Sequence, residues 1–288
     1  MRSFLEVDDL DASELAAVLD ASQEKDPLRI LDGRGVALVF EKPSARTRNS
    51  SEMAVVQLGG HPVTIRGEEV GFDVRESVED VTRTLACYHA VIAARVYDHR
   101  TLVRMADVSP VPVVNLLSDL GHPCQALADL LTLRQRWGSL DGRTIAWVGD
   151  WNNVARSLAI GARLSGMTFR AAGPAGYGPD DEARSLGVVV AGSAAEVVAA
   201  ADAVVTDTWT SMGQEEETAA RRVAFAEWTV DDALLSSAAP DAVFLHCLPA
   251  HRGEEVTDEV LDGPRSLVWQ EAENRMHVMR GIFGWVLA

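Results

Sequence analysis

Two arginines and two hydroxyl residues gather in Ser44-Ala45-Arg46-Thr47-Arg48, shortly after an apolar run. The pattern predicts a strand over Val36–Phe40 and a helix over Arg46–Leu58 that ends at Gly59-Gly60. The first turn of a helix has unpaired backbone N–H groups and the positive end of the helix dipole. Guanidinium groups match phosphate oxygens, so this junction predicts a phosphate site. Arg95, after another apolar run, is a second candidate for the anion, with a surface salt bridge as the alternative.

The segment His122-Pro123-Cys124-Gln125 places two neutral polar side chains at a predicted junction between a loop and a helix. A histidine N–H and a glutamine amide suit a carbonyl or amide group better than a dianion. The alternative is a histidine with a purely structural role. Cys124 is expected to be a packing residue, because no basic residue adjoins it in the sequence.

An acidic segment, Asp207-Thr208-Trp209-Thr210-Ser211-Met212-Gly213-Gln214, follows the apolar run Ala203–Thr206. Its place directly after a predicted strand favours a ligand-binding loop over an acidic surface loop. We expect Asp207 and the backbone around Ser211-Met212-Gly213 to hold the ammonium and carboxylate of an amino acid.

The segment His246-Cys247-Leu248-Pro249 invites a thiol nucleophile with a histidine base. Adjacent residues in an extended segment point to opposite sides, so direct activation of Cys247 by His246 is disfavoured. We expect no metal site, because His246 and His251 lack clustered partners in the sequence. Gly149-Asp150-Trp151-Asn152-Asn153 resembles a nucleotide loop but lacks the G-x-G-x-x-G pattern of dinucleotide enzymes.

Composition narrows the class of protein. A length of 288 residues with 47% hydrophobic residues predicts a globular protein of about two domains. The net charge of -17 argues against nucleic-acid binding, so local arginines must attract any anionic substrate. Three cysteines without C-x-x-C spacing argue against a disulfide framework and for a reducing cytoplasm. An acidic N-terminus and the lack of a long apolar run predict neither a targeting segment nor a membrane span.

Short apolar runs alternate with amphipathic segments, which predicts an α/β fold with two doubly wound domains built on parallel sheets. We expect a first domain over residues 1–137, joined by a C-terminal helix (272–288) that packs back on it, and a second domain over 138–271. The further expected strands are His61–Ile65, Ala90–Ala94, Val111–Val114, Thr144–Val148, Phe169–Ala172, Val188–Ala191, Ala203–Thr206, Val243–Leu245 and Leu267–Trp269. The further expected helices are Ser77–Ala86, Gln125–Trp137, Val154–Leu164, one capped by Ser193 with Glu196, and Ala272–Leu287. All the polar motifs then follow strands, where ligands of such sheets bind.

The motifs, in this order, resemble those of the aspartate/ornithine carbamoyltransferase superfamily. S-x-R-T-R and H-P-x-Q mark the superfamily, and D-x-x-x-S-M-G and H-C-L-P point to its ornithine-specific branch. The resemblance covers nearly the whole chain from Phe4. It implies transfer of a carbamoyl group from carbamoyl phosphate to the δ-amine of L-ornithine, by direct attack. The products would be L-citrulline and phosphate, as in arginine biosynthesis, with no cofactor and no metal.

The resemblance also implies roles for individual residues. Arg95, His122, Asp207 and Cys247 would be catalytic. The first domain would be the carbamoyl-phosphate-binding domain, and the second would bind ornithine. The implied contacts of carbamoyl phosphate are Ser44, Ala45, Arg46, Thr47, Arg95, His122, Gln125, Cys247, Leu248 and Arg275. The implied contacts of ornithine are Asn153, Asp207, Ser211 and Met212. The superfamily assembles as trimers or multiples of trimers, with active sites at subunit interfaces that include a loop from the neighbouring subunit.

Two positions depart from the superfamily pattern. Gly71 aligns with a glutamine that would touch carbamoyl phosphate from the neighbouring subunit. In this chain that contact either comes from elsewhere, with Arg75 as the candidate, or is missing. Ser51 stands where phenylalanine is usual. Three alternatives stay open: a carbamoyltransferase for putrescine or an acylated ornithine, a non-catalytic binding or regulatory paralogue, and a nucleotide-binding oxidoreductase.

Overall fold

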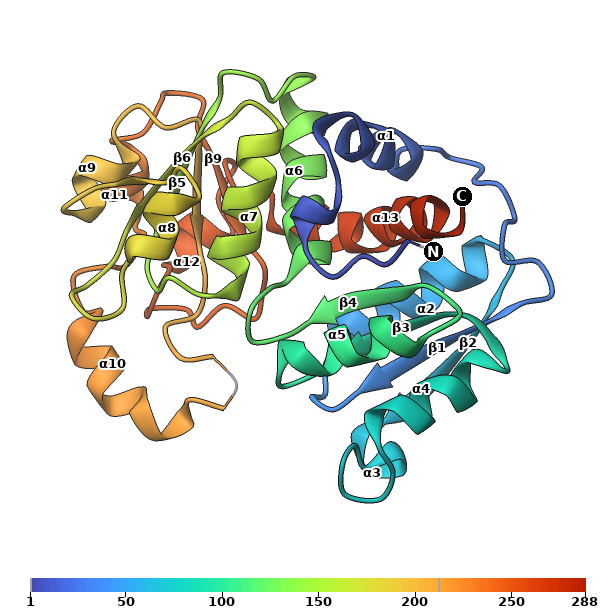
Figure 1. The fold of residues 1–288 in the computed structure, drawn as a ribbon. Helices are drawn as coiled ribbons and strands as arrows, with labels where there is room; N and C mark the ends of the chain where they lie inside the picture. Colours follow the sequence, from blue (N-terminus) through green and yellow to red (C-terminus); the bar gives the residue numbers. More distant parts are fainter. Residues whose placement is uncertain (1, 212) are drawn as a thin grey trace. The chain divides into compact units, whose positions relative to one another are not determined.

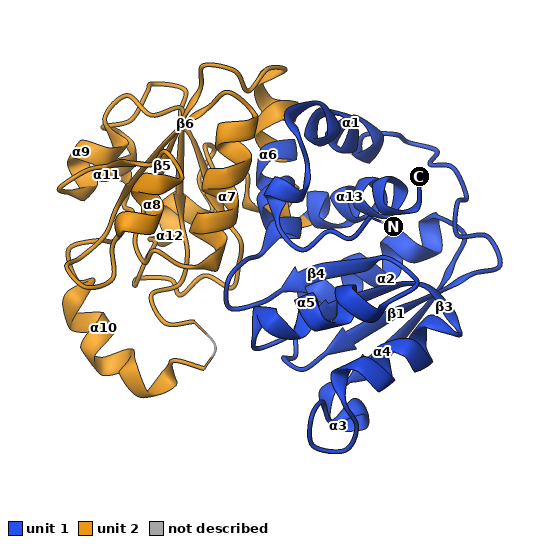
Figure 2. Ribbon diagram, viewed as in Figure 1, with its two compact units in different colours: residues 1–131, 273–288 blue, residues 132–272 orange. Residues whose placement is uncertain are grey.

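The computed structural model describes residues 2–211 and 213–288, and the chain divides into two compact units (Figure 2). Unit 1 consists of residues 1–131 and 273–288, and unit 2 consists of residues 132–272. The first division falls within helix α6 (Pro123–Trp137) and the second within helix α13 (Val268–Leu287).

Unit 1 is built on a sheet of four parallel strands in the order β2-β1-β3-β4 (Figure 1). Its strands are β1 (Gly35–Phe40), β2 (His61–Arg66), β3 (His89–Arg95) and β4 (Val113–Leu117). Its first helices are η1 (Val7–Asp9), α1 (Ala12–Ser22), α2 (Ala45–Gln57), α3 (Gly67–Val70), α4 (Val78–Ala86) and α5 (His99–Val108). The chain moves outward from β1 to β2 and returns to β3 on the other side. The switch point of this sheet therefore lies between β1 and β3.

Unit 2 is built on five parallel strands in the order β7-β6-β5-β8-β9. Its strands are β5 (Thr144–Val148), β6 (Thr168–Ala172), β7 (Val189–Val190), β8 (Ala203–Thr206) and β9 (Val243–His246). Its helices are α7 (Asn153–Leu164), α8 (Asp181–Ser185), α9 (Ala194–Val198), η2 (Glu215–Glu217), α10 (Thr218–Ala224), α11 (Asp232–Leu235) and α12 (Asp258–Leu261). The strand order reverses between β5 and β8, which makes that the switch point of the second sheet.

The central strands are apolar and buried, as strands covered by helices on both faces must be. Each unit has its own hydrophobic core. In unit 1, Ile92 packs with Leu102 and Met105, and in unit 2, Phe244 packs with Val204. The expected α/β fold with two doubly wound parallel sheets is confirmed.

Helix α13 ends the chain, and its residues from 273 onward belong to unit 1. Arg280 donates hydrogen bonds to Oε1 of Gln57 (3.1 Å) and to the carbonyl of Ser22 (2.9 Å). The ring of Trp285 meets Phe4 edge to face. These contacts confirm that the C-terminal helix packs back on the N-terminal part of the chain.

The strand expected over Leu267–Trp269 is wrong. Ser266 makes one bridge to Phe244, and the N–H of Leu267 donates to the carbonyl of Phe244 (2.9 Å). The carbonyl of Leu267 already accepts the N–H of Glu271 (2.8 Å), so the helix begins there, four residues earlier than expected. A short apolar run at the start of a helix has no periodicity that separates it from a strand.

Two other expected strands are present with shifted limits. Strand β4 runs over Val113–Leu117 instead of 111–114, and β7 contains only Val189 and Val190. Helix caps are closer to expectation: the hydroxyls of Ser77 and Ser193 accept the N–H groups of Asp80 and Glu196.

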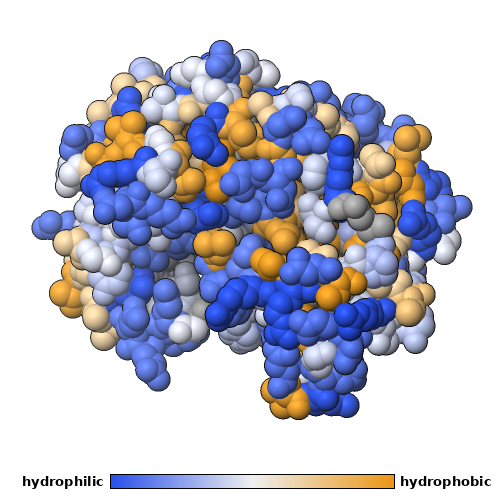
Figure 3. Space-filling view, viewed as in Figure 1, coloured by the Kyte–Doolittle hydropathy of each residue, from blue (hydrophilic) through white to orange (hydrophobic). Residues whose placement is uncertain are grey.

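Hydrophilic side chains cover most of the face seen in Figure 3, as expected for a chain with 43 acidic residues against 26 basic ones. Across the described ranges, no helix combines the length and apolarity that a membrane crossing requires.

Candidate active site

In both units, the motif residues lie at the carboxyl ends of strands, and those after β1, β3 and β8 lie beside the switch points. In unit 1, Ser44 follows β1, Arg95 ends β3 and His122 follows β4. In unit 2, Asp207 directly follows β8 and Cys247 directly follows β9. This placement is where open α/β sheets bind ligands.

Ser44 is the N-cap of helix α2. Its hydroxyl accepts the N–H of Thr47 (3.2 Å) and lies 3.1 Å from the Thr47 hydroxyl. The backbone N–H groups of Ala45 and Arg46 precede the first hydrogen bond of the helix ladder, so they are open to an anion.

The two arginines of this helix start are not equivalent. Nε of Arg48 pairs with Glu52 (3.1 Å), and the same carboxylate accepts the hydroxyl of Thr64. Arg46 is exposed, and the structure gives it no acidic partner within the described ranges. Arg46 is therefore available to an incoming anion, whereas Arg48 is occupied.

Arg275, on helix α13, joins two of the motifs from its buried position. Its guanidinium donates to Oε1 of Gln125 and to the hydroxyl of Thr47 (3.3 Å). The amide of Gln125 in turn donates to Asp129 (2.7 Å). These bonds fix the orientation of the Gln125 amide. We call Ser44, Thr47, His122, Gln125, Arg95 and Arg275 the arginine cluster.

His122 is buried and uncharged at neutral pH. Burial, followed by the neighbouring charges of Arg275 and Arg95, holds its pKa well below 6.5. A neutral imidazole can donate one hydrogen bond and accept another, which suits the oxygen or nitrogen of a carbamoyl group.

Cys124 does not take part in this chemistry. Its thiol donates to the carbonyl of Asn115 (3.2 Å), and burial raises its pKa to about 12. A thiol that stays protonated at neutral pH is a packing residue, as expected from the sequence.

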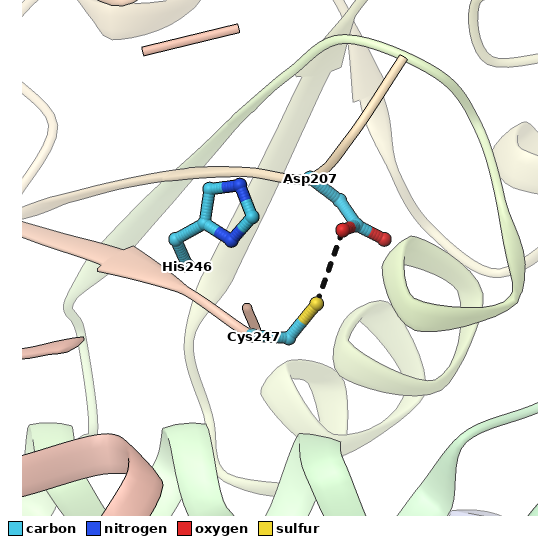
Figure 4. A group of neighbouring side chains, drawn as sticks. All are labelled: Asp207, His246 and Cys247. Atoms are coloured by element: carbon cyan, nitrogen blue, oxygen red, sulfur yellow. Dashed lines mark hydrogen bonds between the residues drawn. The ribbon is translucent and has the colours of Figure 1, made fainter. Parts of the chain in front are cut away.

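In unit 2, a thiol and a carboxylate meet (Figure 4). Sγ of Cys247 donates to Oδ1 of Asp207 at 3.1 Å. The amide of Asn152 donates to Oδ2 of the same carboxylate (2.8 Å), and the N–H of Thr208 donates to Oδ1 (2.7 Å). We call Asn152, Asp207 and Cys247 the thiol–carboxylate cluster.

His246 has a structural role beside this cluster. Its Nδ1 accepts the backbone N–H of Leu248 (2.9 Å), so Nε2 carries the proton and donates it to Glu255 (3.0 Å). Both ring nitrogens are engaged, and neither serves Cys247 as a base. The geometry therefore agrees with the prediction that His246 does not activate the thiol.

The expectation that these histidines lack clustered partners is wrong. One donor atom from each of Asp207, His246 and Cys247 lies within 4.8 Å of the others, and the same holds for His251, Glu254 and Glu255. The first group could not be read from the sequence, because the ends of β8 and β9 meet only in the fold. The second group could have been, since its three members lie within five consecutive residues. Nevertheless, Glu254 pairs with Arg222 (2.7 Å), and both nitrogens of His246 make hydrogen bonds. A metal ion would have to displace these bonds.

The remaining predicted contacts lie in unit 2. Leu248 follows Cys247 and has a left-handed backbone (φ 58°), and Asn153 is the first residue of α7. Ser211 donates its N–H to Oε1 of Gln214 (3.0 Å). Met212 lies outside the described residues.

Sequence reasoning overlooked three residues. Asn152 caps α7, and its side-chain amide donates to Oδ2 of Asp207 (2.8 Å). The preference of asparagine for the N-cap could have identified it. Glu255 and Arg221 are buried residues of charged type. Each has a partner four residues earlier, His251 and Glu217, but the pairing of Arg221 with Asp150 comes only from the tertiary fold.

The chain belongs to the aspartate/ornithine carbamoyltransferase family. The carbamoyl-P binding domain of this family matches residues 2–135, and its Asp/Orn binding domain matches residues 141–286.

Among individual proteins, the chain is 50% identical to the ornithine carbamoyltransferase of Acidothermus cellulolyticus, an alignment that covers 100% of this chain and 97% of the relative. The crystal structure of ornithine carbamoyltransferase from Thermus thermophilus is similar, with 42% identity, a TM-score of 0.93 and coverage of 100% and 99%. An acetylornithine transcarbamylase complexed with acetylcitrulline is 27% identical, with a TM-score of 0.89 and full coverage of both chains.

Gly71, which departs from the superfamily pattern, caps helix α3 with φ +55°. A Cβ built there would lie 2.9 Å from side-chain carbons of Arg75. The backbone at this position is thus shaped for glycine.

Proposed function

We propose that this protein transfers the carbamoyl group of carbamoyl phosphate to the δ-amine of L-ornithine, giving L-citrulline and phosphate. The observation that carries the proposal is the pairing of Cys247 with Asp207 in unit 2, in a chain whose unit 1 holds an arginine cluster. One unit offers groups for a phosphorylated acyl donor, and the other offers groups for an amine.

We assign carbamoyl phosphate to unit 1, the carbamoyl-phosphate-binding domain. Ser44, Ala45, Arg46 and Thr47 would bind the phosphate through hydroxyls, helix N–H groups and a guanidinium. Arg95 and the neutral His122 would polarise the carbamoyl oxygen as it becomes an oxyanion. The further proposed contacts are Gln125, Cys247, Leu248 and Arg275.

We assign ornithine to unit 2. Its α-ammonium and α-carboxylate would bind Asn153, Asp207, Ser211 and Met212, which leaves the δ-amine to react. An amine of this kind has an ordinary pKa of about 10, so it must lose a proton before it attacks. The Asp207–Cys247 pair offers a carboxylate and a thiol near the amine for this purpose. The amine then attacks the carbamoyl carbon directly, phosphate leaves, and neither a covalent enzyme intermediate nor a cofactor is needed.

The identity of the acceptor is tested by comparing three amines in one kinetic assay. Initial rates with L-ornithine, putrescine and N-acetyl-L-ornithine, each with saturating carbamoyl phosphate, give three values of kcat/KM. The proposal predicts the highest value for ornithine by a wide margin, because only ornithine offers both a free α-ammonium and an α-carboxylate. Equal or higher values for either analogue would reassign the acceptor.

We further propose that the protein acts as a homotrimer or a multiple of trimers in the cytoplasm, as a step in arginine biosynthesis. The described residues include three free cysteines, which supports a reducing compartment. Met53, Val56 and Tyr88 of unit 1 are large apolar side chains with 47% to 71% exposure, which favours a covering subunit. Three chains of 31.1 kDa correspond to about 93 kDa, which light scattering would measure in solution.

A further inference from the structure

Arg221 is an arginine of helix α10 whose side chain is only 6% exposed. Its guanidinium pairs with Asp150 (3.2 Å) and Glu217 (2.9 Å) and donates to the carbonyl of Trp209 (3.0 Å). It also lies over the ring of Tyr177, 4.6 Å from the ring centroid. This buried charge therefore has two carboxylates, a backbone carbonyl and an aromatic ring around it, which sets it apart from a surface ion pair.

Two partners of Arg221 lie near Asp207 or near a residue that binds it. Trp209 lies two residues after Asp207 in the chain. Asp150 lies two residues before Asn152, whose amide donates to Oδ2 of Asp207 (2.8 Å). A single guanidinium thus ties the segment after β8 to the segment after β5, at the switch point of this sheet.

Aromatic packing stiffens the same connection. Trp209 stacks on Phe225 with 5.7 Å between ring centroids, and Phe225 contacts Tyr177 at 5.2 Å. Because Phe225 is the C-cap of α10, its contact with Trp209 packs the end of this helix against the 207–211 segment.

We propose that Arg221 is a positioning residue for the amino-acid subsite, which holds residues 207–211 in the geometry that binds the acceptor. The inference rests on the proposed function, because it takes ornithine as the ligand of that segment. Arg221 itself touches no reacting atom in this proposal. It acts through the Trp209 carbonyl and through Asp150, so it affects acceptor binding and leaves carbamoyl phosphate binding unchanged.

The ionisation of Asp150 gives the connection a pH dependence. Burial raises the pKa of Asp150 to about 6, and the charges of Asp207 and Glu217 act in the same direction, while Arg221 opposes them. Protonation of Asp150 below that pH removes one of the charges that hold the guanidinium. Acceptor affinity should therefore fall as the pH drops through 6.

The test compares Arg221→Met and Arg221→Lys with Arg222→Met. Arg222 is the next residue of the same helix, but it is exposed and pairs with Glu254, so it is a matched control. For each protein, KM for ornithine, KM for carbamoyl phosphate and kcat are measured. Binding of L-norvaline, which is ornithine without its δ-amine, is titrated from pH 5 to 8 with carbamoyl phosphate present. Asp150→Asn is titrated in parallel.

We expect Arg221→Met to raise KM for ornithine and Kd for norvaline about 10- to 100-fold, with less than a threefold change in KM for carbamoyl phosphate. Arg221→Lys keeps the positive charge but loses the planar, multidentate guanidinium, so its KM for ornithine and its Kd for norvaline should lie between those of wild type and Arg221→Met. Arg222→Met should match wild type, and Asp150→Asn should lose the pH dependence of norvaline binding between pH 5 and 7.

Unchanged ornithine and norvaline constants in Arg221→Lys and Arg221→Met would overturn the inference. Equal loss of both substrates' affinities would also overturn it, since that indicates general damage. If Arg221→Met does not fold, Arg221→Lys and Asp150→Asn decide by the same criteria. Failure of the proposed function is distinguishable, because wild type itself would then form no citrulline.

Discussion

The thiol of Cys247 donates a hydrogen bond of 3.1 Å to the carboxylate of Asp207, and not to its chain neighbour His246. The pairing joins the ends of β8 and β9, which are adjacent strands of the same sheet. It places a carboxylate and a thiol together while His246 stays bonded to Glu255. A cysteine–histidine nucleophile is thereby disfavoured, and a role in binding an amine is favoured.

Removal of this thiol should weaken the handling of ornithine. A hydrogen bond to a charged group contributes about 1.5–3 kcal/mol, so Cys247→Ala should lower kcat/KM for ornithine about 10- to 100-fold. Cys247→Ser keeps a hydrogen-bond donor, so its kcat/KM for ornithine should fall less. Steady-state kinetics at saturating carbamoyl phosphate measures both. If Cys247→Ala abolished turnover entirely and wild type formed a carbamoylated enzyme by intact mass, a covalent thiol mechanism would replace the present one.

The two arginines at the start of α2 should differ in their contributions. Arg46→Ala removes a guanidinium that has no acidic partner among the described residues, so citrulline formation should fall by about 100-fold or more. Arg48→Ala removes one that is paired with Glu52, so activity should change little. Circular dichroism of both variants confirms that the fold survives. Equal loss in the two variants would contradict the assignment of Arg46 to the phosphate.

The neutral state of His122 predicts a pH dependence of stability. The folded pKa lies well below the unfolded value of 6.5, so the unfolded chain binds more protons between the two values. The stability contributed by this group is complete above pH 6.5 and is lost as the pH falls below it. The slope for one such proton is about 1.4 kcal/mol per pH unit.

Urea unfolding of wild type and His122→Gln between pH 5 and 8 tests this point. The difference in slope below pH 6.5 isolates His122, since His89 and His277, whose pKa values are also lowered, are present in both proteins. Parallel stability curves for the two proteins would contradict a lowered pKa of His122 in the folded protein.

Restoring the superfamily glutamine at position 71 should not improve this protein. Gly71→Gln places a side chain at φ +55°, which costs about 1–2 kcal/mol, and its Cβ would press on Arg75. The variant should therefore have a lower free energy of unfolding in urea and no gain in affinity for carbamoyl phosphate. A gain in both quantities would show that the loop readily adopts the usual family conformation.

Much of the fold could be predicted from the sequence, because parallel strands buried on both faces appear as short apolar runs between amphipathic helices. The prediction failed at Leu267–Trp269, because a short apolar run at the start of a helix has the same sequence pattern as a buried strand. Motif order identified the family, and strand ends gave the location of the motif residues. The sequence could not predict which side chains of the site bind one another. Arg275 binds Gln125 and Thr47, and Arg221 binds Asp150, and in each case the partners come from distant segments of the chain.

The central claim is carbamoyl transfer to ornithine by this protein without a metal, a cofactor or a second kind of chain. Citrulline formation tests it most directly. Purified protein is treated with a chelator and mixed with ¹³C-labelled carbamoyl phosphate and L-ornithine, and the product is identified by mass spectrometry. The account predicts ¹³C-citrulline from wild type and a large loss in both Arg46→Ala and Asp207→Asn. A folded wild-type protein that binds carbamoyl phosphate but forms no labelled citrulline would contradict it and would favour a non-catalytic paralogue.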